Sequence, residues 1–382
     1  MWALTRKEQL LLLVVVALAL GEGVTHFGQI FPDSLSYIPA AFWFLGISMP
    51  SSCTICDYRL LRPVVPLLAA ILSHVVDIRT AFAIENLAFW VASAVLMFRF
   101  TQFLTKKATE AAIAAILFTT ATPVLVYGSA VLTDSAGFFF VMVGVYLVVI
   151  WDLMKASWSR VAIASLIMSI GILSRETVAS VLFFAIVWTL FTKGSWAKLL
   201  VFLAIPTVAA LSWSHLIGVS YFAWAAENAA VAAQNNSLAP APRLRLLAIT
   251  VGEAFRIEVL GLAFLGFIQL SSKRPLIAYL AILLGLGAYV GFAPGEADVR
   301  YTFILFPAIL PLAATGITYL AHLIGYSPLA DTLRLSDKNR RQILILFPIL
   351  LVSLLIVVTN ISAIRYLSFP WHAYVDLSVK WP

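Results

Sequence analysis

The chain has 382 residues, of which 62% are hydrophobic and only 11% are charged. A soluble globular protein is nearer half apolar and a quarter charged, so this composition excludes a chain of soluble domains. The formal net charge of +7 at pH 7 does not indicate nucleic-acid binding. The basic residues stand in short clusters between apolar runs, which is typical of the cytoplasmic flanks of membrane-spanning helices.

Apolar segments long enough to cross a membrane follow one another through most of the chain. A crossing helix needs about 20 mainly apolar residues. If every basic cluster is cytoplasmic, about eleven helices result, with the N-terminus inside and the C-terminus outside. The first segment resembles a signal peptide, but the spans after it favour an uncleaved helix. The expected spans are residues 8–21, 80–104, 108–126, 133–151, 161–174, 177–192, 199–217, 252–271, 275–293, 301–323 and 342–360.

One apolar region, residues 161–192, allows two interpretations, because Arg175 and Glu176 interrupt it. A single helix over this region would be roughly 50 Å long, which exceeds the membrane thickness unless the helix tilts steeply. It would also move Lys193 and Lys198 to the outer side. A hairpin that turns near Arg175 keeps every basic cluster inside, and we therefore predict a hairpin.

The first loop, residues 22–79, is expected on the outer side, as are the loop 218–250 and the tail 361–382. The apolar stretches 35–47 and 63–76 of the first loop are too short to span. We expect them to form helices that lie along the membrane interface. The predicted fold class is therefore all-α: a polytopic integral membrane protein whose long first outer loop carries interfacial helices.

Ionisable residues from separate segments gather at the outer ends of the expected spans. Charged groups at membrane depth are costly and usually face a polar cavity or each other. Arginine binds phosphate oxygens through a bidentate fork, and a carboxylate can accept the proton of a hydroxyl. We therefore expect a site for an anionic, hydroxyl-rich ligand. Its candidate residues are Asp33, Asp134, Arg175, Glu176, Arg256, Glu296 and Arg300.

Other roles are open for some of these side chains. Asp134 could be the N-cap of the helix that it begins, and Asp33 could cap the short helix that follows it. Charged residues at helix ends are also common anchors at the membrane surface. The arginines that look most like such anchors are Arg59, Arg62, Arg243, Arg245 and Arg365.

Five short motifs occur in a fixed order on the expected outer side. They are Phe31-Pro32-Asp33-Ser34-Leu35-Ser36-Tyr37, Tyr58-Arg59-Leu60-Leu61-Arg62-Pro63, Leu132-Thr133-Asp134-Ser135, Leu173-Ser174-Arg175-Glu176-Thr177 and Val299-Arg300-Tyr301. Over residues 8–325 this succession resembles the GT-C superfamily of polytopic glycosyltransferases, such as the dolichyl-phosphate-mannose mannosyltransferases. The resemblance implies a GT-C-like transmembrane catalytic domain at 1–325. A cytoplasmic loop, a last transmembrane helix and a short outer tail are expected at 326–382.

The resemblance also implies roles for individual residues. Asp33 and Asp134 match the acids of the first two outer loops and are expected to be catalytic, with Asp33 as the base. Arg175 and Arg300 match positions that hold the lipid phosphate of the donor. The supporting residues are expected to be Tyr37, Glu176, Arg256, Glu296 and Tyr301. Many members carry paired acids in the first loop, whereas Ser34 follows Asp33 here, so we expect no metal and no other cofactor; a divalent metal is the alternative.

The expected function is transfer of a sugar, by inverting displacement, from a polyprenyl-phosphate donor to a lipid-borne, glycan or protein acceptor. The reaction would occur at the outer or lumenal face of the cell membrane in a prokaryote, or of the endoplasmic reticulum in a eukaryote. The alternative is a transporter or flippase of an anionic or lipid-linked substrate. Such proteins place their charges near the midplane, often in repeated halves. A structural membrane subunit without activity is a third possibility.

The cysteines, glycosylation sequons and histidines carry less information. Cys53 and Cys56 lie on the expected outer side, where a structural disulfide is possible; two free thiols and a redox pair are the alternatives. The sequons Asn235-Asn236-Ser237 and Asn360-Ile361-Ser362 both fall outside on this topology. No two of the five histidines have ligand spacing along one helix, so no zinc site is expected.

Overall fold

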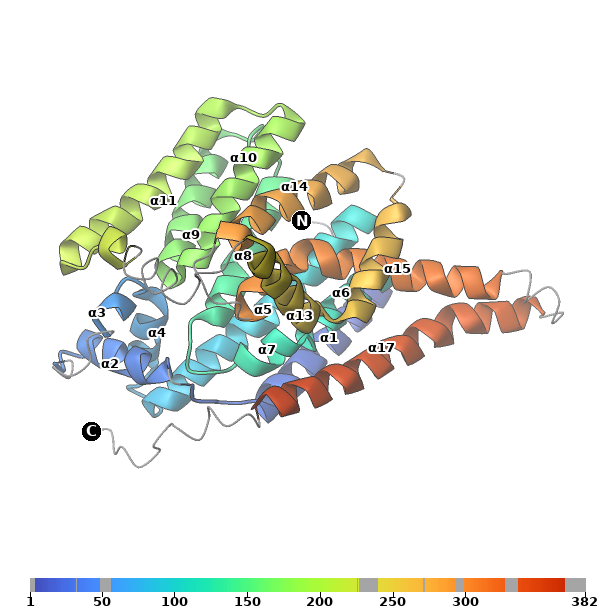
Figure 1. Cartoon of the computed structure of the whole chain (residues 1–382), viewed down its shortest axis with the longest axis horizontal. Helices are drawn as coiled ribbons and strands as arrows, with labels where there is room; N and C mark the ends of the chain where they lie inside the picture. Colours follow the sequence, from blue (N-terminus) through green and yellow to red (C-terminus); the bar gives the residue numbers. More distant parts are fainter. Residues whose placement is uncertain are drawn as a thin grey trace.

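The computed structural model describes residues 4–31, 33–48, 56–224, 226, 240–270, 272–292, 299–326 and 336–367. Within these ranges the chain forms helices and connecting turns and has no β-strand, which confirms the all-α class (Figure 1). Among these residues, five helical segments are long and apolar enough to cross a membrane, and shorter apolar helices accompany them. The chain is an integral membrane protein.

The chain begins with one long helix and a loop that carries three short ones. Helix α1 (Arg6–Thr25) starts at a capping box, in which Thr5 and Glu8 each bond the other's backbone. The first loop then carries α2 (Ser34–Phe44), α3 (Cys56–Arg59) and α4 (Val64–Leu72). Helices α2 and α4 coincide with the two predicted short apolar helices, and both are too short to span a membrane.

The later helices follow the expected spans. Helix α5 (Ile78–Thr105) begins at Asp77, whose carboxylate accepts the N–H of Thr80 at 3.0 Å. Each expected span overlaps a helix or a pair of short helices. The remaining elements are α6 (Ala108–Thr119), α7 (Thr122–Tyr127), α8 (Asp134–Ile150), α9 (Trp158–Ser174), η1 (Glu176–Ala179), α10 (Ser180–Thr192), α11 (Trp196–Ile217), α13 (Pro240–Ile268), α14 (Lys273–Phe292), η2 (Val299–Leu305), α15 (Phe306–Gly325) and α17 (Asp337–Leu367).

The interrupted region 161–192 forms the predicted hairpin. Helix α9 ends at Ser174, Arg175 has an extended backbone, and η1 follows directly. The far ends of α9 and α10 lie together, because the N–H of Ser195, after α10, donates to the carbonyl oxygen of Met154, before α9, at 3.2 Å. One continuous helix would hold these two residues at opposite ends, so the hairpin is confirmed.

Helices α5, α6, α8 and α15 form the centre of the bundle. Helices α8 and α15 bury most of their side chains, α5 packs against α6 and α8, and α15 packs against α6 and α13. Helices α13 and α15 cross closely, because a Cβ atom on Gly266 would overlap the carbonyl oxygen of Leu312, and one on Gly316 would overlap that of Leu262. Figure 1 shows α9, α10 and α11 on one flank of this centre and α17 on the other.

Three segments that are far apart in the sequence meet at one end of the bundle. They are the first-loop helices α2 to α4, the start of α8, and the turn between α9 and η1; α4 contacts α9, and α8 contacts η1. In Figure 1 the three first-loop helices lie together at this end, next to the lower end of α11. At the other flank α17 packs against α15 and α7. The division of the chain into 1–325 and 326–382 stays a prediction.

Candidate functional site

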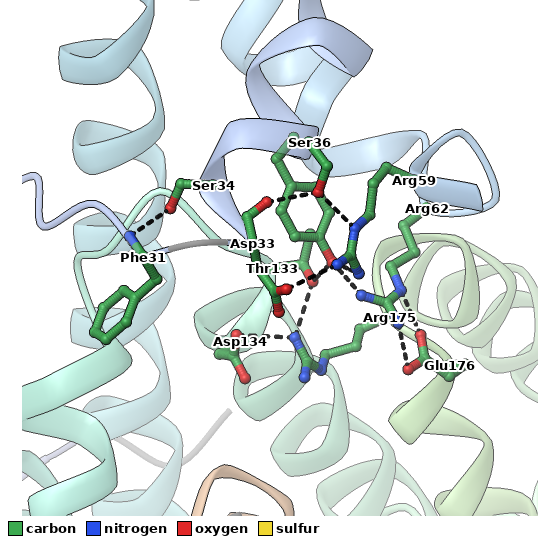
Figure 2. Close-up of polar contacts among 11 residues, drawn as sticks. Phe31, Asp33, Ser34, Ser36, Arg59, Arg62, Thr133, Asp134, Arg175 and Glu176 are labelled. Carbon is green, nitrogen blue, oxygen red and sulfur yellow. Dashed lines mark hydrogen bonds and ion pairs between the residues drawn. The ribbon is translucent and has the colours of Figure 1, made fainter. Parts of the chain in front are cut away.

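Asp33 stands immediately before α2, and Arg59 of α3 holds its side chain (Figure 2). The Arg59 guanidinium donates from Nη2 to Asp33 Oδ1 at 3.0 Å and from Nε to Ser36 Oγ at 2.9 Å. Ser36 Oγ in turn donates to the backbone carbonyl oxygen of Asp33 at 2.7 Å. The Asp33 side chain is 32% exposed, against 10% for Arg59. Asp33 therefore offers a fixed, partly open carboxylate at the edge of a buried polar group.

The Tyr37 hydroxyl is a junction of buried hydrogen bonds. It accepts one bond from Nη1 of Arg59 at 3.4 Å and one from Nη1 of Arg62. It also shares a hydrogen bond with Oγ1 of Thr133 at 3.1 Å. A phenol oxygen accepts up to two hydrogen bonds and donates one, so the two arginine donors direct the phenol proton toward Thr133. The hydroxyl is thus fully engaged, and Tyr37 is only 1% exposed.

Asp134 and Arg175 form an ion pair at the start of α8. Nη1 of Arg175 lies 2.8 Å from Asp134 Oδ2 and donates to Thr133 Oγ1 at 3.0 Å. Asp134 is completely buried and Arg175 is 2% exposed. Gly137 makes room for the arginine, because a Cβ atom there would lie 2.8 Å from its Cδ. The buried Nε–H of Arg175 has no acceptor among the described residues, which is an unusual state for a buried donor.

Arg62 joins the first loop to the turn between α9 and η1. Its Nε lies 2.6 Å from Glu176 Oε2, and its Nη2 donates to Glu176 Oε1 at 2.6 Å, so the pair is bidentate. The carbonyl oxygens of the two leucines before Arg62 accept bonds from Trp213 Nε1 at 2.7 Å and from the Tyr221 hydroxyl at 2.6 Å. The Arg62 guanidinium also lies 5.7 Å from the centre of the Trp224 ring. These contacts fix the arginine-bearing segment against α11 and the residues after it.

These contacts define an arginine–carboxylate cluster in which three guanidinium groups meet three carboxylates. Charges at this depth are tolerated when they are paired and hydrogen-bonded. Burial by itself raises the pKa of the Tyr37 phenol, but the guanidinium groups of Arg62, Arg59 and Arg175 outweigh burial, so this pKa lies below its ordinary value. The members of the cluster are Asp33, Tyr37, Arg59, Arg62, Thr133, Asp134, Arg175 and Glu176.

In the part of the chain that the structure describes, neither aspartate caps a helix with its side chain. Asp33 occupies the position before α2, but within the described chain its side chain makes no capping hydrogen bond and turns to Arg59 instead. Asp134 is the first residue of α8, and Thr133 occupies the cap position. Both carboxylates are thus committed to arginines that come from other segments. Pairing with arginines from distant segments is needed to build a polar site and is not needed to cap a helix.

The interpretation of Arg59 and Arg62 as interface anchors is also wrong. Each is 8% exposed and takes part in the cluster, whereas an anchor at the interface keeps its charged end in water. Thr133 is a further member that the sequence did not single out. One sequence signal was available: the two arginines are three residues apart and therefore lie on the same side of a helical turn. Their burial could not be read from that spacing.

The other predicted site residues lie outside this cluster or outside the described structure. Arg256 stands at a break in α13, where its φ of 63° is in the left-handed region; it donates to Ser362 Oγ at 2.6 Å and pairs with Glu258 at 3.4 Å. Arg300 and Tyr301 belong to η2, which packs against α8, α13 and α14, but their side chains are not among those described. Glu296 lies outside the described residues.

The histidines, sequons and cysteines are not part of the arginine–carboxylate cluster. The described residues contain no group of three or more His, Cys, Asp or Glu side chains that could hold a metal ion. Asn360 and Ser362 of one sequon lie within α17, where Asn360 Nδ2 donates to Glu22 Oε1 at 3.4 Å, so this triplet is not in a loop. The other sequon and Cys53 lie outside the described residues, and Cys56 is buried and disulfide-bonded.

Comparison with known proteins bears on the fold. No protein-family model matches the sequence, and no curated protein matches it. Among solved structures, the chain is similar to an oligosaccharyltransferase from Archaeoglobus fulgidus, which was crystallised with a disulfide-tethered acceptor peptide containing an NVT sequon. The TM-score is 0.56 at 13% sequence identity, over 94% of this chain and 55% of the other, so this chain spans about half the length of that neighbour. The chain has the fold of the GT-C glycosyltransferases.

Proposed function

We propose that this protein is a membrane glycosyltransferase that moves a sugar from a polyprenyl-phosphate donor to an acceptor hydroxyl or amide, with Asp33 as the general base. One observation carries the proposal: in a GT-C fold, Asp33 is the most open carboxylate of a buried arginine–carboxylate cluster, and Arg59 fixes its position. A base must be held within reach of the proton that it removes. The fixed, partly exposed carboxylate of Asp33 supports this role.

The proposed reaction is a single inverting displacement. The Asp33 carboxylate takes the proton of the acceptor, the acceptor atom bonds to C1 of the sugar, and the bond from C1 to the phosphate oxygen breaks. The polyprenyl phosphate leaves with the bonding electron pair, and positive groups lower the barrier by stabilising this charge. Orientation of the two reactants supplies much of the remaining acceleration. No metal is required by this scheme.

Arg175 and Arg300 are proposed to hold the donor phosphate. Arg300 lies on η2, which packs against α8, the helix that begins at Asp134. Arg175 has a buried Nε–H without an acceptor among the described residues, and a phosphate oxygen is a suitable acceptor. Asp134 is completely buried against Arg175, so its proposed role is to orient that arginine. Glu176 fixes Arg62 in the same way.

The donor sugar and the acceptor are proposed at the level of class. The donor is proposed to be a hexose, such as mannose, on a polyprenyl phosphate, because the order of the outer-loop motifs resembles that of the dolichyl-phosphate-mannose mannosyltransferases. The acceptor is proposed to be lipid-borne, a glycan or a protein. The similar oligosaccharyltransferase was crystallised with an acceptor peptide, which shows that a protein of this fold can take a peptide acceptor. The reaction is proposed at the outer or lumenal face, because the basic clusters between the helices assign the opposite end of the bundle to the cytoplasm.

The test is transfer by the purified protein in lipid, with a panel of radiolabelled polyprenyl-phosphate sugars and mixed acceptors. We expect the wild type to consume one donor and Asp33→Asn to lose transfer while keeping its unfolding midpoint. Asp152→Asn is the matched control, since Asp152 follows α8 at the end opposite Asp134, and its one ion pair within the described part of the chain is with Lys155. Absence of both donor binding and transfer by the folded wild type would contradict the proposal and favour a transporter.

A further inference from the structure

We infer that the Tyr37 hydroxyl is a positioning group for Asp33: it holds the Arg59 guanidinium in the orientation that aims the Asp33 carboxylate at the acceptor. This inference rests on the proposed transfer reaction and deepens it. Tyr37 is buried one helical turn along α2 from Asp33 and does not itself reach the open side of the cluster. Its effect on the reaction must therefore pass through the side chains that it bonds.

Arg59 carries the connection between Tyr37 and Asp33. Its three guanidinium nitrogens each donate to an acceptor at the start of α2: Nε to Ser36, Nη1 to Tyr37 and Nη2 to Asp33. The guanidinium is planar and rigid, so the positions of two nitrogens determine that of the third. The guanidinium also lies over the Tyr37 ring, 4.7 Å from its centre. Tyr37 thus sets both the plane of the guanidinium and its rotation within that plane.

The Tyr37 hydroxyl is anchored from the opposite side. Its proton points to Thr133, and Thr133 Oγ1 also accepts from Arg175, which is paired with Asp134. Arg62 donates to the same phenol oxygen and is held by both oxygens of Glu176. The hydroxyl therefore transmits the fixed positions of the α8 start and of the α9–η1 turn to Arg59. Figure 2 shows this chain of contacts leading from Arg175 and Thr133 toward Asp33.

The substitution Tyr37→Phe removes one oxygen atom and keeps the ring beneath Arg59. Ser36 and Tyr37 hold two guanidinium nitrogens independently of Asp33, and with the Nη1 bond lost only the Nε–Ser36 bond of this pair remains. The guanidinium can then turn about Nε and carry the Asp33 carboxylate with it. A misplacement of about 1 Å near a reacting centre can lower the rate about 100-fold. We expect kcat for sugar transfer to fall by about 10- to 100-fold and the KM for the donor to stay within about twofold, since Tyr37 bonds no proposed donor-binding atom directly.

The experiment is a double-mutant cycle of Tyr37→Phe and Asp33→Asn, measured as kcat and donor KM with a radiolabelled polyprenyl-phosphate sugar. If Tyr37 acts through Asp33, adding Tyr37→Phe to Asp33→Asn lowers the residual rate no further. Thr133→Ser, which keeps the hydroxyl, should retain more activity than Thr133→Val. The matched control is Tyr279→Phe: Tyr279 on α14 is completely buried, and its hydroxyl has no partner among the described residues. This control should transfer at the wild-type rate.

Two results separate this inference from the proposed function. An active Asp33→Asn would refute Asp33 as the base, whereas an inactive Asp33→Asn together with an unimpaired Tyr37→Phe would refute the positioning role alone. Equal fold-losses from Tyr37→Phe in the wild type and in Asp33→Asn would also overturn it. If the folded wild type transfers no sugar, the unfolding midpoints of the wild type, the two single mutants and the double mutant are compared instead. Non-additive midpoint shifts then support the connection through Arg59, and additive shifts overturn it.

Discussion

Arg62 and Glu176 are 114 residues apart in the sequence and form a bidentate ion pair with both nitrogen–oxygen distances at 2.6 Å. Their side chains are 9% and 18% exposed. The pair joins the first loop to the turn of the α9–α10 hairpin, and it thereby closes the arginine–carboxylate cluster on the side away from Asp33. The first loop is therefore an integral part of the bundle end and not a separate surface feature.

Loss of either partner of the Arg62–Glu176 pair is expected to destabilise the fold strongly. Removing one partner of a buried pair leaves the other charge without compensation, which destabilises a protein by about 3–5 kcal/mol. We expect Arg62→Ala to lower the free energy of unfolding by about that amount, measured by denaturant titration in detergent. Arg160→Ala, at an exposed position on α9, is the control and should change it by less than about 0.5 kcal/mol. Equal effects of the two substitutions would show that the pair is not needed for the fold.

The crossing of α13 and α15 should tolerate no side chain at its two glycines. A Cβ atom on Gly266 would overlap the backbone carbonyl oxygen of Leu312, which cannot move aside as a flexible side chain would. We expect Gly266→Ala to separate the helices and destabilise the protein by about 2–3 kcal/mol. Gly261→Ala on the same helix is the matched control, since nothing lies within 4 Å of its Cβ position. It should stabilise the helix by about 0.5–1 kcal/mol, measured as the unfolding midpoint.

The pH dependence of stability should contain a contribution from Tyr37. Its pKa in the folded protein lies below the ordinary value, because three guanidinium groups outweigh burial. Between the folded pKa and the unfolded value of about 10, the unfolded state binds more protons, so the free energy of unfolding rises with pH in that window. The stability difference between wild type and Tyr37→Phe should therefore widen from neutral pH toward pH of about 10. Unfolding midpoints over this range, with tyrosinate absorbance, test it; a constant difference would contradict it.

The sidedness of the bundle can be tested with single cysteines. Ser220 follows α11 at the end that carries the first loop, and Lys338 starts α17; both are exposed. A membrane-impermeant thiol reagent applied from outside should label Ser220→Cys and leave Lys338→Cys unlabelled until the membrane is permeabilised. Cys56 is disulfide-bonded, and the unsubstituted protein sets the background labelling. Labelling of Lys338→Cys alone would place the arginine–carboxylate cluster in the cytoplasm and refute the proposed face of the reaction.

Hydrophobic composition and charge spacing were enough to predict most of the fold. Runs of about 20 apolar residues form helices because backbone groups in a membrane have no water to bond and must bond within their own segment. The hairpin at Arg175 followed from the same reasoning, since a single helix over 161–192 is too long and reverses the sidedness of Lys193 and Lys198. The confirmed all-α fold and the short helices α2 and α4 thus needed no tertiary information.

The partners of the charged residues were decided by the tertiary structure alone. The sequence identified Asp33, Asp134 and Arg175 as residues of one site, but it classed Arg59 and Arg62 as surface anchors and passed over Thr133. The sequence pattern around a charged residue near a helix end is the same whether the side chain faces lipid headgroups, water or another side chain. Its environment depends on which segments pack beside it. Hydrophobic runs specify how many helices form and where they end. The packing of these helices brings residues such as Arg62 and Glu176 together, and the need to pair buried charges fixes which groups meet.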